Sequence, residues 1–201
     1  SKENRTIILE VMERTWITGF TQFELGIFKD TDPRVEVIKF AIQKKLKQAL
    51  EETDDTYWVI TGGQSGIEQW AVSAALALKP DYPQLCVSIM TPYQQFGSNW
   101  KQERQEQLHA LVQQVDFSAS VSPQPYQNAG QLQNYQQFML NHTDNALLFY
   151  DEEAEQSKVR FARKAILQFQ QHHPNYELFQ VDFEKLQDYA EEYAEQQSDW
   201  S

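Results

Sequence analysis

The sequence contains few of the residues that build disulfides and metal sites. Its 201 residues include one cysteine, Cys86, which stands in the apolar run LCVSIM. One cysteine forms no disulfide within the chain, so we interpret Cys86 as a buried core residue of a cytoplasmic protein. The four histidines show no ligand spacing with acids or with the cysteine, so no metal site is predicted.

Long apolar segments are also absent. No run of about 18 apolar residues occurs, so the sequence predicts no membrane span. The stretch SKENRTIILEVMERTW carries charges on both sides of a very short apolar patch, which is not the pattern of a secretory signal. Residues 1–11 fit no predicted element. We interpret them as an upstream extension or a cloning remnant outside a single domain at residues 12–201.

Basic residues are scarce relative to acidic ones. Lysine and arginine number 17 against 29 aspartates and glutamates, which leaves a formal net charge of −12. Such a surface repels phosphate backbones, because nucleic-acid affinity depends mainly on cations that displace counterions. The basic run KKLK at residues 44–47 is too short to override this field and is interpreted as a solvated helix face. No nucleic acid is therefore expected as a partner.

Apolar and amphipathic segments alternate along the whole chain. Continuously apolar segments predict strands at residues 14–19, 57–61, 84–91, 117–121, 145–151 and 176–181. Helices are predicted at residues 33–49, 67–78, 100–115, 131–140 and 159–171, with a last one from Phe183. Parallel crossovers need long connections, so repeated β–α units of this length imply helices on both faces of a parallel sheet. The predicted fold is α/β: a single-domain, doubly wound, mostly parallel sheet of the Rossmann-like kind.

Ligands of such sheets bind at the carboxyl ends of the strands, near the point where the strand order reverses. Four loops follow predicted strand ends, after Gly19, Thr61, Thr91 and Asp151. We therefore expect the binding site to be built from these loops.

The loop after Thr61 belongs to the stretch VITGGQSGIEQWAVSAAL, which contains Gly62, Gly63 and Gly66. These glycines do not match GxGxxG, because Gln64 occupies the place of the second glycine, and no Lys-Ser/Thr pair follows as in a P-loop. Glycines after a parallel strand still leave backbone N–H groups uncovered. The next helix points its positive end at the same space, which suits a phosphate or diphosphate. The alternative is that the glycines only form a tight turn and allow close helix–strand contact.

Glu68 lies directly after this loop and allows two interpretations. Residues 65–68 spell a capping box, S-x-x-E, in which the carboxylate satisfies free N–H groups of its own helix. Alternatively, Glu68 faces the ligand and accepts hydrogen bonds from ribose hydroxyls. If the protein is an enzyme, Glu68 is the candidate catalytic residue, because it can protonate or orient a leaving group at a glycosidic bond.

The loop after the first strand, TGFTQFELGIF, adds Gly19, Glu24 and Gly26 as candidate ligand-binding residues. Its aromatic residues Phe20 and Phe23 either stack on a base or cover the core.

The two remaining loops add four candidates. TPYQQFGSNW contributes Thr91, Pro92 and Trp100, and Trp100 is either a base platform or a packing anchor at a helix start. Asp151 ends an apolar strand, where a doubly wound sheet presents a polar contact to its ligand. The alternative is that Asp151 only caps the strand end.

Taken together, these loops resemble a known family. TWITGFTQFELGIF, ITGGQSGIEQWAVSAAL, TPYQQFGSNW and DNALLFYDEE are similar, in order from about Arg14 onward, to motifs of the YpsA-like proteins of low-GC Gram-positive bacteria. That family belongs to the SLOG (Smf/DprA–Lonely Guy) superfamily of Rossmann-like domains. The resemblance implies a nucleotide-related ligand, ADP-ribose or an NAD-like molecule, over the glycine loop. The motif positions are Gly19, Glu24, Gly26, Gly63, Gly66, Glu68, Trp70, Pro92, Trp100 and Asp151.

The sequence departs from the family pattern in one place. YpsA-like relatives tend to have a Gly-Ser-Pro-Lys turn after the acidic loop, whereas EQSKVRF keeps only Ser157 and Lys158 in that order.

Two functions follow from the resemblance, and we favour the first. The protein is a cytoplasmic sensor or regulator that holds a ribose-containing nucleotide, or it is an N-glycosidic hydrolase like the Lonely Guy group. A hydrolase needs an acid on the leaving group and a cation on the phosphate. Arg104 is the candidate for this cation, and the alternative is that Arg104 is a solvated residue on a helix face. The sequence allows a homo-oligomer and indicates no protein partner.

Overall fold

The computed structural model describes residues 12–199, so the interpretation of residues 1–11 lies outside the described part. The strands are β1 (Met12–Gly19), β2 (Thr56–Thr61), β3 (Leu85–Thr91), β4 (Phe117–Ser120), β5 (Asn145–Phe149) and β6 (Glu177–Val181). The helices are α1 (Pro33–Leu50), α2 (Ile67–Leu78), α3 (Gln102–Val112), α4 (Gly130–Asn141), α5 (Val159–Gln170) and α6 (Phe183–Ser198). Every predicted strand and helix is present, within a few residues of its predicted bounds.

The strands form one parallel sheet in the order β4-β3-β2-β1-β5-β6. The chain steps outward from β1 to β4 and then returns to the other side of β1, where β5 pairs with it. The α/β, doubly wound prediction is therefore confirmed. The strand order reverses between β1 and β5, which places the expected ligand crevice above these two strands.

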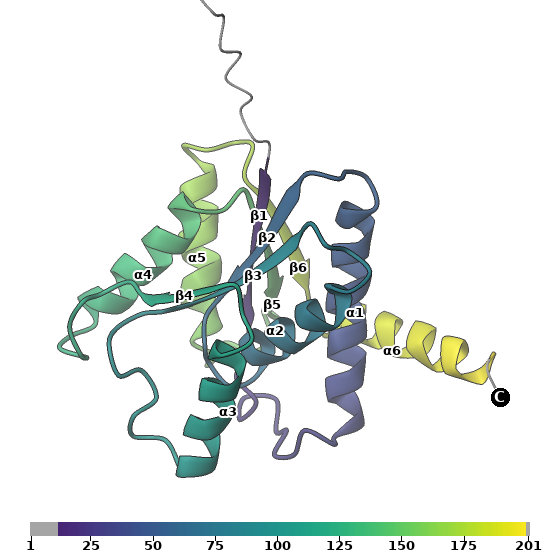
Figure 1. Ribbon diagram of the computed structural model, residues 1–201, viewed down its shortest axis with the longest axis horizontal. Helices are drawn as coiled ribbons and strands as arrows, with labels where there is room; N and C mark the ends of the chain where they lie inside the picture. The colour runs from purple at the N-terminus through teal and green to yellow at the C-terminus, as the bar shows by residue number, and fades with distance from the viewer. Residues whose placement is uncertain (1–11, 200–201) are drawn as a thin grey trace, which may run out of the picture.

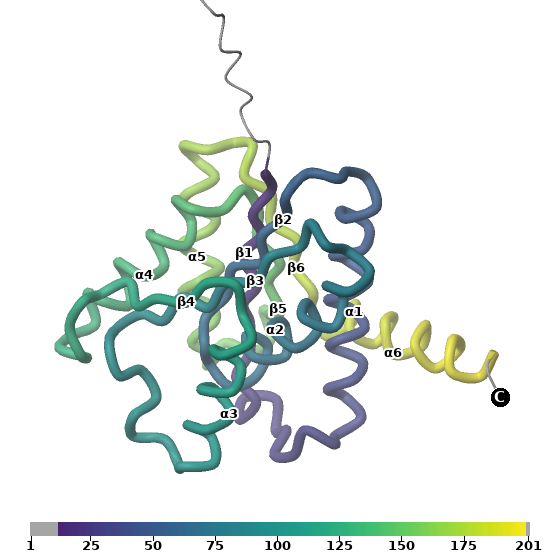
Figure 2. The backbone as a smooth tube through the Cα atoms, viewed as in Figure 1, coloured from purple at the N-terminus to yellow at the C-terminus, as the bar shows by residue number. Residues whose placement is uncertain are grey.

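Helices cover both faces of the sheet (Figure 1). Helices α4 and α5 pack on one face, while α1 packs against α2 and α6 on the other. The tube in Figure 2 shows the end of α6 projecting away from the sheet. None of the helices within residues 12–199 is long and apolar enough to cross a bilayer.

Local sequence explains where α1 begins. The Asp32 side chain accepts a hydrogen bond from the Arg34 backbone N–H at 2.9 Å, and Pro33 occupies the first turn. The apolar residues Val35, Ile38 and Leu46 are all buried, as the helical period predicts.

Tertiary contacts shift two element ends. The helix predicted from Trp100 begins at Gln102, because Trp100 closes a turn in which its N–H bonds to the Gly97 carbonyl at 3.0 Å. The strand predicted to reach Asp151 ends at Phe149, because the neighbouring β1 turns away after Gly19.

The expectation for Cys86 is wrong in degree. Cys86 is half-buried rather than buried. It pairs with Trp58 of β2, which is also half-buried, so the helices cover this part of the sheet face incompletely.

Candidate functional site

The loop after β1 lies across the start of α2, at the carboxyl edge of the sheet. Thr21 and Gly66 form an antiparallel bridge, and the Ile67 N–H donates to the Phe20 carbonyl at 3.1 Å. Gly66 has a φ of +119°, and a β-carbon there would lie 2.6 Å from the Gln22 backbone nitrogen. Only glycine fits this crossing, so Gly66 has a clear structural role.

Glu68 does not form the capping box that its sequence spells. The N-cap of α2 is Gly66, with no side-chain cap, and the Ser65 hydroxyl instead donates to Gln22 Oε1 at 2.6 Å. Glu68 Oε2 accepts from the Thr18 hydroxyl at 2.8 Å, and Oε1 accepts from the Gln64 N–H at 3.0 Å. The carboxylate therefore links the glycine loop to the end of β1. Since a carboxylate can accept about four hydrogen bonds, it retains capacity for a ligand.

The environment of Glu68 makes ionisation of its carboxyl group less favourable than in solvent. Burial raises the pKa of Glu68 above its ordinary value, although the hydrogen bonds from Gln64 and Thr18 oppose the shift. The side chain is still only half-buried, so solvent reaches part of it. A carboxyl group with a raised pKa at the carboxyl edge of the sheet is a candidate functional group.

Tyr135 reaches the same corner from α4, on the opposite face of the sheet (Figure 1). A β-carbon on Gly62 would lie 2.6 Å from the Tyr135 hydroxyl and closer still to Glu68 Oε1. Gly62 is therefore required for the two oxygens to approach the end of β2. The Tyr135 side chain is 9% exposed, and its hydroxyl has no hydrogen-bond partner.

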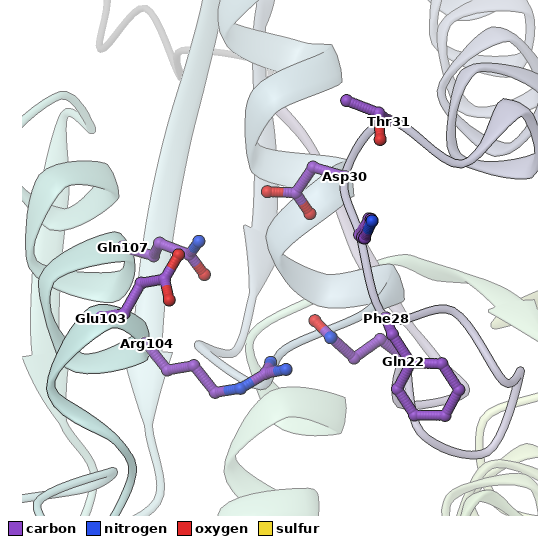
Figure 3. Close-up of a pocket in the computed structure, with 8 residues that line it drawn as sticks. Gln22, Phe28, Asp30, Thr31, Glu103, Arg104 and Gln107 are labelled. Atoms are coloured by element: carbon purple, nitrogen blue, oxygen red, sulfur yellow. The ribbon is translucent and has the colours of Figure 1, made fainter.

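A cavity of about 320 Å³ opens between the loop after β1 and α3 (Figure 3). Its lining residues are Gln22, Phe28, Lys29, Asp30, Thr31, Glu103, Arg104 and Gln107. Arg104 extends from α3 toward Gln22 in Figure 3, and its Nη1 donates to the Ser65 hydroxyl at 3.2 Å. Arg104 is thus held against the glycine loop and is not merely a solvated helix-face residue.

Two exposed aromatic rings flank this cavity. Phe23 and Phe28 are 58% and 69% exposed, with ring centroids 6.4 Å apart. The Arg104 guanidinium lies 4.6 Å from the Phe23 ring centroid. Phe20, in contrast, is buried and stacks on Phe183 at 5.5 Å. Phe20 therefore covers the core, whereas the exposed ring of Phe23 is free to stack on a base.

A larger cavity of about 440 Å³ lies at the opposite edge, where the strands begin. Four acidic residues line it, Glu13, Glu52, Asp144 and Glu177, against the single cation Lys45. This charge balance disfavours an anionic nucleotide. The cavity of about 320 Å³ is the better candidate for the nucleotide site, because it lies at the carboxyl edge of the sheet and has a less negative lining.

Glu24 and Gly26 lie in the exposed part of the loop after β1. Glu24 Oε1 accepts from the Thr21 N–H at 2.9 Å, and Gly26 has a φ of +66° with open space around it. Gly19 packs against Phe149, where a β-carbon would lie 2.7 Å from the Phe149 carbonyl. These residues shape the loop that carries the exposed aromatic rings.

The loop after β3 contacts the glycine loop through only some of its predicted residues. A β-carbon on Gly63 would lie 3.5 Å from Thr91 Cγ2 and 2.8 Å from Leu108 of α3. Pro92 is buried, and Trp100 packs edge-to-face on Phe96 at 5.2 Å within its own loop.

Asp151 uses both carboxylate oxygens on backbone amides. Oδ1 accepts from the Glu153 N–H at 2.8 Å, and Oδ2 accepts from the Phe183 N–H at 3.0 Å. These bonds connect the end of β5 to the start of α6. They agree with the interpretation in which Asp151 only caps the strand end.

Comparisons with known proteins identify the family. The chain matches the model of the YpsA family, described as the YspA SLOG family, over residues 15–186. It is 50% identical to a UPF0398 protein of Leuconostoc citreum over 188 residues, or 94% of this chain and 97% of the relative. The chain belongs to the YpsA family of SLOG proteins. UPF0398 proteins of Limosilactobacillus reuteri and Oenococcus oeni are 48% and 45% identical, over 92% and 93% of this chain and 97% and 98% of theirs.

The match confirms the resemblance drawn from the sequence motifs, and membership of the SLOG family points to a nucleotide-related function. At the place where YpsA-like proteins tend to have a Gly-Ser-Pro-Lys turn, Ser157 is buried and its hydroxyl accepts from the Val159 N–H at 3.2 Å. The remaining serine of this turn therefore accepts a hydrogen bond from the first residue of α5, whose N-cap residue is Lys158.

Sequence reasoning missed Thr18, Gln22 and Tyr135 in this YpsA-family site. The buried positions Gln131, Tyr135 and Met139 of α4 lie four residues apart, so helical periodicity could have marked Tyr135 as inward-facing. No local pattern reports that its hydroxyl ends beside Glu68.

Proposed function

We propose that this protein binds a ribose-containing nucleotide, such as ADP-ribose or an NAD-like molecule, and acts as a cytoplasmic sensor or regulator. One observation carries the proposal. A carboxyl group with spare acceptor capacity, Glu68, and a guanidinium group, Arg104, both bond to the same glycine loop. Ribose hydroxyls need the first kind of group, and phosphates need the second.

The surroundings suit the other parts of such a ligand. Arg104 and Lys29 line the cavity and supply positive charge for a phosphate, next to the acidic residues Asp30 and Glu103. The exposed rings of Phe23 and Phe28 offer faces for a base at the rim of the cavity.

Titration calorimetry with AMP, ADP-ribose and NAD tests this proposal. We expect Glu68→Gln and Arg104→Gln to weaken binding by about tenfold or more, since the first removes a carboxyl oxygen that can accept hydrogen bonds and the second removes a guanidinium group that can donate them. A melting-temperature series with the same nucleotides reports binding independently, because a bound ligand stabilises the folded state by mass action.

Matched variants separate binding from stability. Arg160 also stacks on an exposed phenylalanine, Phe161, at 4.3 Å, but lies on α5 away from the cavity. Glu13 also has a pKa raised mainly by burial, but lines the opposite cavity. Arg160→Gln and Glu13→Gln should leave affinity unchanged. Loss of stability with normal binding in Glu68→Gln would contradict the proposed role of that carboxylate.

The raised pKa of Glu68 supports a second candidate, an N-glycosidic hydrolase in which Glu68 is the general acid. Chromatography of the incubated nucleotides distinguishes the two. Intact ligand with a melting shift supports the sensor, whereas free base that disappears in Glu68→Gln supports the hydrolase.

A further inference from the structure

The Tyr135 hydroxyl is a buried polar group that the folded protein leaves unpaired. Within residues 12–199, two buried side-chain polar atoms have no hydrogen-bond partner, the Tyr135 hydroxyl and Trp16 Nε1. Buried hydroxyls are paired in most proteins, because an unsatisfied one destabilises the folded state. A phenylalanine would fill the same space without this penalty, so the hydroxyl calls for an explanation.

The position of the Tyr135 hydroxyl suggests why it is unpaired. The Tyr135 hydroxyl and Glu68 Oε1 both lie within 2.6 Å of the point that a β-carbon on Gly62 would occupy. The two oxygens are therefore separated by less than twice that distance. Neighbouring hydroxyls of one sugar can bond to two groups this close, since each O–H···O bond spans about 2.7 Å.

The two groups also complement each other chemically. Glu68 has acceptor capacity beyond its bonds to Thr18 and Gln64, and it is partly open to solvent. Burial, and then the nearby Glu68 charge, raise the pKa of Tyr135 well above its usual value, so its hydroxyl stays protonated. A phenol can donate one hydrogen bond and accept another.

We propose that Glu68 and Tyr135 together bind the vicinal hydroxyls of the ribose, so that the site selects ribonucleotides over deoxyribonucleotides. Glu68 accepts from one hydroxyl, and Tyr135 bonds to its neighbour. This inference rests on the proposed nucleotide binding and adds to it a residue from α4 and a basis for sugar selectivity.

The test compares AMP, 2′-deoxy-AMP and 3′-deoxy-AMP on the wild-type protein and on Tyr135→Phe by titration calorimetry. The wild type should prefer AMP to at least one deoxynucleotide. Tyr135→Phe should bind AMP about three- to tenfold more weakly, with a smaller loss for that deoxynucleotide. Its melting temperature without ligand should equal or exceed that of the wild type, because the unpaired hydroxyl is gone.

Tyr176→Phe is the matched control. The Tyr176 hydroxyl is also buried but bonds to Thr143 at 2.8 Å, so this variant should lose stability and keep the sugar preference. An unchanged preference in Tyr135→Phe, or no preference in a wild type that binds AMP, would overturn the inference and leave the proposed function standing. A wild type that binds none of these three nucleotides and neither ADP-ribose nor NAD would overturn the proposed function itself.

Discussion

At the scale of single residues, Glu68 shows how a fold orients a carboxyl group and shifts its pKa. Its hydrogen bonds come from a neutral hydroxyl and a backbone amide, Thr18 and Gln64. These bonds orient the side chain, but they do not outweigh the effect of burial on its pKa. The same residue was open to a purely local interpretation as a helix cap, which the contacts of Ser65 do not support.

The raised pKa of Glu68 should make the free energy of unfolding depend on pH. The folded-state pKa of Glu68 lies above the ordinary value of 4.5, so between these two pKa values the folded protein holds a proton that the unfolded chain has lost. Glu68 therefore supports folding at low pH, and this contribution is lost as pH rises through its folded pKa. We expect Glu68→Gln, which does not titrate, to gain stability relative to the wild type as pH rises from about 4 to 8.

Urea unfolding at several pH values measures this difference. Glu13→Gln should show the same sign, because the pKa of Glu13 is also raised mainly by burial. If the free energy of unfolding of Glu68→Gln instead falls relative to that of the wild type as pH rises, the folded protein stabilises Glu68 as the carboxylate.

At the scale of elements, the junction between β2 and α2 depends on a crossing of backbones. The loop after β1 bonds to the first residues of α2, and Gly66 is the point of closest approach. The glycines of this loop thus serve close packing as well as any ligand. Both interpretations of the glycine stretch have a physical basis, since Gly66 contacts backbone while Gly62 makes room for Glu68 and Tyr135.

Alanine substitutions at Gly26 and Gly66 should separate the cost of a positive φ from the cost of steric clashes with the new β-carbon. Gly66 and Gly26 both have positive φ, but only Gly66 has neighbours that a β-carbon would strike. We expect Gly26→Ala to lower the free energy of unfolding by about 1 kcal/mol. Gly66→Ala should cost about 3 kcal/mol or more, because overpacking adds to strain. Equal losses in urea unfolding would mean that the loop after β1 moves aside easily.

At the scale of the whole molecule, the strand order brings the site together. Because the chain returns past β1 before forming β5, α4 lies on the face opposite α2, and Tyr135 and Glu68 approach from two sides. The net charge of −12 sets the long-range field, while Arg104 places a positive charge beside the glycine loop. If the protein binds an anionic nucleotide as proposed, the net charge repels that ligand at a distance and only local contacts hold it.

Ionic strength should reveal this balance in the association kinetics. Salt screens charges farther apart than the Debye length, about 10 Å at 0.1 M, more than it screens close contacts. We expect the association rate constant for AMP to rise between about 20 and 200 mM salt, measured by stopped-flow mixing. A rate constant that falls with salt would mean that a positive local field dominates the approach, as in nucleic-acid-binding proteins.

The sequence by itself determined the alternation of strands and helices, the glycine loop and the placement of Glu68 after it. Apolar periodicity, helix caps and turn residues act over a few neighbours, so a single chain segment reports them. Only the tertiary structure decided that Asp151 bonds to backbone amides, that Arg104 reaches Ser65 and that Tyr135 lies beside Glu68. These contacts join residues far apart in the chain, and they depend on strand order and helix placement, which no local pattern encodes.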